Sequence, residues 1–398
     1  MSQNWSELPE ELLKMIAEKI EFLDDFVRFS VVCRSWSLVK FNKHHFSSIV
    51  KSQFPWLMLA NDDDNSNSRR FFNYPQNKIC HMKLSKASGC HCWGSPFGWL
   101  VVLGLDSQFL LNPLSGVWFS LPSLAQYRDR SCRGLSSLNV LSYDWRYPKR
   151  NRMSCVRKAI IVSTMNNSID DTDDENVVGG FLVFLIVGRF RELAFARPGD
   201  NTWTNIISTL ISRVTPFQED ILHFNGRFYA VNFFGYICVC DDITTKGGSC
   251  RPTLLPFASP PEFSMGWTRT FYLVELCGDL HLAVRNINCS EPRSRTVFIE
   301  LYKLDLCTLK WEKVECLGDY ALFLGSNTSF SSKASVCRGC KPGCIYFTDD
   351  SEGVDVGRIF GHDMGLFNLQ TGGIESFYEG DCILSLFSPP VWIKPNPF

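Results

Sequence analysis

The sequence predicts a multidomain protein, in which a small all-α module is followed by an all-β propeller of about six blades. Three observations predict this architecture. Apolar residues at helical spacing are concentrated in residues 1–50. The remainder of the chain is a succession of short strand-like segments separated by turn signals. One turn motif recurs at intervals of roughly one propeller blade. We expect the module at residues 1–50, a linker at 51–75 and the propeller at 76–398.

The helical module begins near Pro9, which suits the first helical position because its missing N–H group costs no hydrogen bond there. Glu10 and Glu11 complement the positive start of the helix dipole. An apolar stripe at helical spacing follows, at Leu12, Leu13, Ile16 and Ile20. A second helix, capped by Asp24 or Asp25, carries Phe26, Phe29, Val32, Cys33 and Trp36. A unit of this size buries little apolar surface, so we expect it to have a partner.

This module resembles an F-box. The resemblance is carried by Leu8-Pro9, Leu12-Leu13, Ile16, Val31-Val32-Cys33-Arg34 and Trp36. In that family the helices bind a Skp-type adaptor, which attaches the protein to the cullin and RING subunits of a ubiquitin ligase. The resemblance implies that the adaptor is bound by Leu8, Pro9, Leu12, Leu13, Ile16, Val31, Cys33 and Trp36. The periodicity alone leaves an alternative, a helical hairpin that caps the large domain.

Composition indicates a globular intracellular protein. Of the 398 residues, 45% are hydrophobic and 20% are charged, and the net charge of -1 gives no electrostatic reason to bind nucleic acid or an acidic membrane. The polar N-terminus does not resemble a signal peptide, and the longest apolar run, Phe181–Val187, is too short to span a bilayer. We therefore expect a soluble protein of the nucleus, the cytoplasm or both, with neither nucleic acid nor membrane as a partner.

The 17 cysteines are expected to be reduced thiols. Their number is odd, no secretory signal is present, and the chain is long enough to build a core without disulfides. Many lie in apolar strand patterns, as Cys238 and Cys240 do, where cysteine acts as a small hydrophobic residue.

The linker at 51–75 is expected to contain a short strand at 55–59 and an exposed loop at 61–68, which has no apolar residue. Beyond it, residues 219–257 give the clearest strand pattern. Asn225-Gly226 is the strongest hairpin signal, and four antiparallel strands in about forty residues is the size of one propeller blade. Residues 269–316 repeat the plan, with a turn at Gly278-Asp279.

The recurring turn precedes the last strand of a blade. It starts at Asn112, Asp305 and Asn368, whose side chains can accept hydrogen bonds from backbone N–H groups two and three residues on. Looser copies lie at 197–202 and 241–245. The intervals between copies predict a propeller of about six blades, and propellers of five or seven blades remain as alternatives. Radial repetition also explains how so long a segment buries its apolar residues.

A second resemblance covers the propeller. Residues 272–285, 311–325, 344–350 and 389–395 are similar to a plant family of F-box proteins whose kelch-like domain has been described as a domain of unknown function. The two resemblances together imply a substrate-recognition subunit of an SCF-type cullin–RING E3 ubiquitin ligase, which binds a target protein through the propeller. The alternative is an interaction scaffold that acts independently of the ligase. A propeller enzyme or lectin-like binder is a third reading.

No catalytic or cofactor site is predicted. Hydrolase, nucleotide-binding and zinc-protease motifs are missing from the sequence, so we expect a non-catalytic protein without a cofactor. Two Cys/His groups could bind a metal: Cys80, His81, Cys90, His91 and Cys92, and Cys337, Cys340 and Cys344. The first group could supply four ligands, whereas the Cys337-x-x-Cys340 pair is followed by no second pair of the kind seen in structural zinc sites. We expect turn residues and half-buried strand cysteines in both groups.

Charged residues cluster in two successive runs. The basic run comprises Arg146, Lys149, Arg150, Arg152, Arg157 and Lys158, and the acidic run comprises Asp170, Asp171, Asp173, Asp174 and Glu175. We interpret them as solvated loops that partly neutralise each other, rather than as a phosphate-binding surface. A regulatory role of the acidic run remains open.

The predicted target surface follows from the alternation of turns in an antiparallel blade. The tight turns, among them Asn225-Gly226 and Gly278-Asp279, share one face of the propeller. The longer loops, including 256–267, lie on the other face. Binding residues tend to lie on loops held by a rigid scaffold. We therefore predict target binding by the long-loop residues Asn288, Glu291, Arg293 and Arg295.

Overall fold

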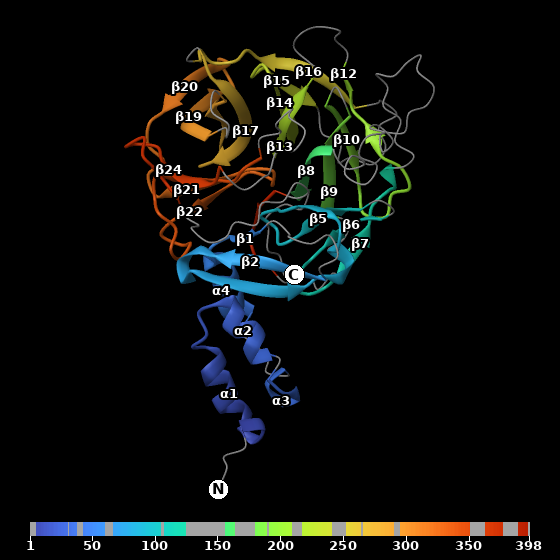
Figure 1. Ribbon diagram of the computed structural model, residues 1–398, viewed down its shortest axis with the longest axis vertical. Coiled ribbons are helices and arrows are strands. Elements are labelled where there is room, and N and C mark those ends of the chain that lie inside the picture. Colours follow the sequence, from blue (N-terminus) through green and yellow to red (C-terminus); the bar gives the residue numbers. More distant parts are fainter. Residues whose placement is uncertain are drawn as a thin grey trace.

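The computed structural model describes residues 5–30, 32–37, 43–59, 67–104, 107–124, 156–163, 180–188, 191–208, 217–240, 252–263, 266–289, 295–350, 363–376 and 389–396. Sheets are arranged in a ring around a centre, and the N-terminal helices project from the rim beside β1 and β2 (Figure 1). The chain thus has the two parts that the sequence predicts.

The helices occupy the N-terminal part, as predicted. They are η1 (Trp5–Glu7), α1 (Glu10–Ala17), α2 (Leu23–Ser30), α3 (Arg34–Ser37) and α4 (Lys43–Ser52). Helix α1 starts directly after Pro9, whose backbone is extended (φ -57°, ψ 145°), and Glu10 forms an ion pair with Lys14 at 2.8 Å. Pro9 is therefore the N-cap, one position before the first helical residue where the sequence analysis places it, and Glu10 and Glu11 lie in the first turn as predicted.

The strands that the structure describes form six sheets, each a blade of the propeller. Blade 1 contains β26 (Val391–Ile393), β1 (Trp56–Met58), β2 (Ser68–Asn73) and β3 (Lys78–Lys83). Blade 2 contains β4 (His91–Trp93), β5 (Leu100–Leu103), β6 (Gln108–Leu111) and β7 (Trp118–Ser120). Blade 3 contains β8 (Val156–Ser163), β9 (Phe181–Val187), β10 (Glu192–Ala196) and β11 (Thr204–Asn205).

Blade 4 contains β12 (Ile207–Ser208), β13 (Gln218–Phe224), β14 (Arg227–Asn232), β15 (Ile237–Cys240) and β16 (Thr253–Ala258). Blade 5 contains β17 (Thr268–Leu276), β18 (Asp279–Asn288), β19 (Arg295–Asp305) and β20 (Lys310–Val314). Blade 6 contains β21 (Tyr320–Leu324), β22 (Phe330–Lys333), β23 (Cys344–Phe347), β24 (Gly365–Asn368) and β25 (Ile374–Glu375). Short 3-10 helices, η2 (Tyr74–Gln76) and η3 (Ser85–Ala87), flank β3. The prediction of about six blades is confirmed.

Most of the predicted turns are confirmed, although the turn between β17 and β18 consists of Cys277 and Gly278 rather than Gly278 and Asp279. Asn225 (φ 49°) and Gly226 (φ 74°) have the left-handed backbone that a tight hairpin needs, and they join β13 to β14. Asn112 Oδ1 accepts from the N–H groups of the residues two and three further on, at 3.0 and 3.1 Å. Asp305 and Asn368 accept in the same way. The recurring turn therefore joins the last two strands of blades 2, 5 and 6.

The ring is closed by the two ends of the chain. In blade 1, Trp56, Leu57 and Met58 of β1 pair with β26, and β1 also pairs with β2. Part of the stretch predicted as a linker, 51–75, therefore lies within the propeller, which starts at Trp56 rather than at residue 76. The correction has a physical reason, since these apolar residues are buried between neighbouring blades.

The segment between β21 and β22 crosses the centre of the ring. Gly325 begins the crossing, with φ 152° and no room for a Cβ atom against Thr348 Oγ1. Thr328 then contacts two other blades: its N–H donates to the Gly94 carbonyl at 3.2 Å, and its hydroxyl accepts from the Ile161 N–H at 3.1 Å. We call residues 325–329 the crossing segment.

The crossing segment makes further contacts with two more blades. Asn327 Oδ1 accepts from the N–H of Trp392 in β26. The Ser329 hydroxyl lies 3.3 Å from Asp220 Oδ2 in blade 4. Asp220 is itself buried, and it also contacts Lys158 Nζ (3.0 Å) and the Leu273 N–H (3.0 Å). This polar network ties the inner strands together where a propeller would otherwise have an open channel.

Candidate functional site

The helical module has a core of its own. Leu13, Ala17 and Phe29 are buried together, and Leu8, Ile20 and Trp36 pack around them. The rings of Phe29 and Trp36 lie 4.6 Å apart, and the Trp36 indole N–H donates to the Trp5 carbonyl at 3.0 Å. This core orients α1 so that its other side faces solvent.

That other side of α1 carries exposed apolar side chains. Leu12, Met15 and Ile16 follow one another at helical spacing on α1, and Trp5 and Val32, which lie outside this helix, are exposed as well. Their exposed fractions are 62% for Trp5, 45% for Leu12, 61% for Met15, 37% for Ile16 and 54% for Val32. We call these five residues the apolar surface. Solvent exposure of so many large apolar side chains on a small module indicates a protein-binding site.

The predicted adaptor-binding residues divide into three groups. Leu12 and Ile16 belong to the apolar surface, and Pro9 is exposed at the start of α1. Leu13, Leu8 and Trp36 belong to the core or pack against it, and Leu13 is only 2% exposed. Leu13 is thus buried within the module and supports the apolar side chains from inside, and adaptor binding by the predicted set stays a prediction.

Two predicted residues need separate mention. Cys33 is half-buried, with Sγ 3.0 Å from the Ser35 hydroxyl, which holds the pKa of the thiol below its usual value. Val31 lies outside the described residues. Sequence reasoning missed Trp5 and Met15, although Met15 is three positions after Leu12 and could have been found from the same helical spacing.

The module is attached to the propeller through buried and polar contacts. Leu23 of α2 and Ile49 of α4 are buried in one apolar cluster with Trp56 of β1. Arg338, in the connection between β22 and β23, reaches the module as well. The guanidinium of Arg338 pairs with the carboxylate of Glu21 at 2.5 Å. The backbone N–H of Arg338 donates to the Ser52 carbonyl at 2.9 Å. The apolar surface therefore has a defined position relative to the blades.

Two of the predicted target-binding residues, Asn288 and Arg295, lie at one end of blade 5. Asn288 ends β18 and pairs with Arg295, the first residue of β19, whose side chain is exposed. Glu291 and Arg293 lie outside the described residues. Target binding by this group therefore stays a prediction.

The cysteine and histidine groups considered as metal sites have other contacts. Cys90 and Cys92 are buried, and burial raises the pKa of both thiols. His91 stacks on Trp93, with ring centroids 4.0 Å apart. Cys337 contacts the Gln53 carbonyl at 3.6 Å. Within the described ranges, no group of three His, Cys, Asp or Glu side chains is placed to hold an ion.

Two members of the basic run have structural partners in blade 4. Arg157 pairs with Glu219 at 2.7 Å, and Lys158 pairs with Asp220 at 3.0 Å. Lys158 is buried in β8, so its place in a strand at 158–163 is confirmed, and the interpretation of the basic run as a solvated loop does not hold for this residue. The remaining basic residues and the acidic run lie outside the described residues. None of the helices described is long and apolar enough to cross a membrane.

Comparison with known proteins covers both parts of the chain. A family model described as KIB1-4 beta-propeller matches residues 71–368, and an F-box domain model matches residues 5–39. The F-box protein SKIP23 of Arabidopsis thaliana is 26% identical, over 99% of this chain and 96% of that protein. The F-box/kelch-repeat protein At1g57790 of the same plant is 25% identical, over 98% and 94%. Both resemblances that the sequence predicts are confirmed.

Proposed function

The chain belongs to the F-box proteins that carry a KIB1-4 beta-propeller, and from this premise we propose that it is the substrate-recognition subunit of an SCF-type cullin–RING E3 ubiquitin ligase. In this role the helical module binds a Skp-type adaptor, and the propeller binds a target protein. The chain itself performs no chemistry. It raises the effective concentration of the target near the ubiquitin-charged enzyme of the ligase.

The observation that carries this proposal is the apolar surface of the module. The propeller packs on the module through Leu23 of α2 and Ile49 of α4 and leaves the apolar surface exposed to solvent. A capping hairpin, the alternative that the periodicity left open, would instead turn its whole apolar stripe toward the large domain. An exposed stripe at positions i, i+3 and i+4 of a helix suits a partner that packs against helices.

The attachment of the module supports the same role. Transfer of ubiquitin needs the target held at a suitable distance from the reacting thioester. The buried contacts of Leu23 and the ion pair between Arg338 and Glu21 give the module a fixed orientation on blades 1 and 6. A bound target is thereby oriented relative to the adaptor.

The test is co-purification of a Skp-type adaptor with a double variant, Leu12→Ala with Ile16→Ala. Truncation of a central apolar contact costs about 1–4 kcal/mol of binding free energy. The double variant should therefore lose detectable adaptor while the propeller keeps its thermal unfolding midpoint. The matched control is Val336→Ala with Ile374→Ala, which truncates two side chains of similar exposure on the propeller.

Adaptor recovery should be unchanged in that control. Full recovery with the Leu12 and Ile16 variant would contradict the assignment of the apolar surface. A wild-type chain that binds target proteins but no adaptor would favour the alternative, a propeller scaffold independent of the ligase.

A further inference from the structure

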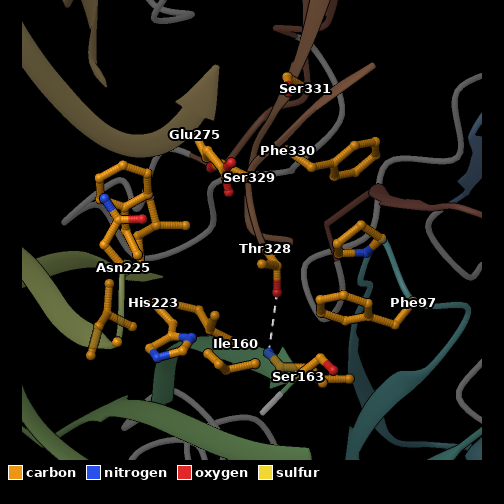
Figure 2. A pocket seen from close by; sticks show the side chains of 17 residues that line it. Phe97, Ile160, Ser163, His223, Asn225, Glu275, Thr328, Ser329, Phe330 and Ser331 are labelled. Carbon is orange, nitrogen blue, oxygen red and sulfur yellow. Dashed lines mark hydrogen bonds between the residues drawn. The ribbon is translucent and has the colours of Figure 1, made fainter. Parts of the chain in front are cut away.

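A cavity of about 600 Å³ lies at the centre of the ring. Its lining comes from blades 2 to 6, and residues 328–331 at and after the end of the crossing segment form part of the wall (Figure 2). Thr328 is anchored there by the hydrogen bond from the Ile161 N–H, drawn as a dashed line in Figure 2. Because the crossing segment is bound to several blades, it obstructs the channel behind the cavity. A volume of this size suits one or two large side chains of a ligand.

The lining of the cavity has two chemically different sides. The rings of Phe97 and Phe330 lie on one side, and the polar side chains of Asn225, Glu275 and His223 lie on the other (Figure 2). Ser163 and Ser331 add hydroxyl groups. A ligand group that is apolar along its length and polar at its tip would match both sides.

The charge of the lining is negative. Glu275 is exposed, and it is the single Asp, Glu, Lys or Arg residue among the described residues that line the cavity. The buried charges nearby, Lys158 and Asp220, already neutralise each other. The one carboxylate of the lining therefore favours a cationic ligand over an anionic one.

We propose that this cavity binds the side chain of a lysine or arginine from a target protein. The carboxylate of Glu275 would accept charge-assisted hydrogen bonds from the ammonium or guanidinium group. The aliphatic part of the side chain would pack against Phe97 and Phe330, whose faces also attract a cation. This inference deepens the proposed receptor function and rests on it, because it names the chemistry by which the propeller recognises a target.

The cavity lies at the end of the propeller where the Asn225-Gly226 turn lies. Asn288 and Arg295 lie at the opposite end, because β18 runs away from the turn that joins it to β17. The cavity is therefore distinct from the loop group predicted to bind targets. Strand β1 also begins at the cavity end, since it is the second strand of its blade, next to β26. A target held in the cavity would thus lie on the side from which the helical module departs.

The first step of the test selects ligands with a phage-displayed library of random short peptides, on the full wild-type chain. The selected peptides should be enriched in lysine or arginine. One such peptide is then synthesised with a fluorescent label, and its Kd is measured by anisotropy. Glu275→Gln should raise the Kd about tenfold to a hundredfold, the range expected for loss of a charge-assisted contact. Glu275→Lys should abolish binding.

Two matched controls accompany these variants. Glu315→Gln removes an exposed carboxylate from the rim of blade 5, and Arg295→Glu reverses a charge at the opposite end of the propeller. Both should leave the Kd unchanged. The proposal would be overturned if the selected peptides were not enriched in basic residues. It would also be overturned if Glu275→Lys left the Kd of the peptide unchanged, or if Arg295→Glu changed the Kd instead. Adaptor binding by the same preparations is a separate readout, so failure of the receptor function itself would be recognised independently.

Discussion

Arg285 and Asp363 form a buried ion pair between two blades, with 2.7 Å between Nη2 and Oδ2. Arg285 lies in β18 of blade 5, and Asp363 precedes β24 of blade 6. The same guanidinium donates to Asp350 at 2.9 Å and to the Thr348 carbonyl at 2.7 Å. Asp363 also accepts from the Thr296 N–H. With these partners the pair is fully hydrogen-bonded, which offsets the cost of removing both charges from water.

Arg285→Ala should therefore be strongly destabilising. The substitution leaves two carboxylates buried without their cation, a loss that typically costs about 3–5 kcal/mol. The measurement is the free energy of unfolding from chemical denaturation. Arg295→Ala, which removes an exposed arginine from the next strand, should change it by less than about 0.5 kcal/mol. Equal effects of the two variants would show that the buried pair contributes nothing specific.

Thr328→Val should destabilise the propeller although it preserves the shape of the side chain. The variant removes the acceptor of the Ile161 N–H, and an unsatisfied buried donor costs about 1–3 kcal/mol. Thr328→Ser keeps the hydroxyl and should retain most of that energy. Thermal unfolding midpoints of the two variants would separate the hydrogen bond from the packing of the methyl group. If Thr328→Ser and Thr328→Val have the same unfolding midpoint, the hydrogen bond to Ile161 does not contribute to stability.

Trp392→Ala should cost about 3–5 kcal/mol, the usual range for truncation of a buried aromatic side chain. Trp392 lies in β26 and packs against Phe54 and Phe323. The comparison is Trp118→Ala, because Trp118 is about half exposed and has a cation–π contact with Lys86. That variant should cost less than about 1 kcal/mol. Resistance to limited proteolysis would measure the destabilisation caused by each variant. If Trp118→Ala were more destabilising than Trp392→Ala, the role of β26 in closing the ring would be refuted.

The stability of the propeller should fall in mild acid because of His281. This side chain is buried in β18, and burial lowers the pKa of its imidazole below the usual value of about 6.5. The unfolded chain takes up a proton near that pH while the folded chain does not. The free energy of unfolding should then decrease from about pH 6.5 downward, by at most about 1.4 kcal/mol per pH unit. His281→Gln should reduce this slope, and identical slopes would exclude the contribution.

Local chemistry allowed several features to be predicted from the sequence. The turns at Asn112, Asp305 and Asn368 depend on hydrogen bonds within three residues, and the hairpin at Asn225-Gly226 depends on backbone preference alone. Such features do not require knowledge of distant residues. The repeated turn also gave the approximate blade count, because each blade uses the same local connection.

Features that depend on distant pairs were not predicted. Thr328 looks like an ordinary loop residue in the sequence, and only its contacts with Gly94 and Ile161 place it at the centre of the ring. In the helical module, periodicity selected Leu12 and Leu13 together. The packing of α2 and α3 decides which of the two leucines faces solvent. The sequence alone therefore could not show that Leu12 is exposed and that Leu13 belongs to the core. The cavity escaped prediction for the same reason, since its walls come from five blades.

The pairing of β1 with β26 has a consequence for synthesis on the ribosome. The helical module emerges first, whereas blade 1 remains incomplete until its last strand, near the C-terminus, has been made. At typical translation rates the delay is roughly 20–70 s. During that interval a nascent chain would present the apolar surface without a closed ring behind it. Products of termination before β26 would share this state, so a closed propeller is available only to chains in which β26 has been translated.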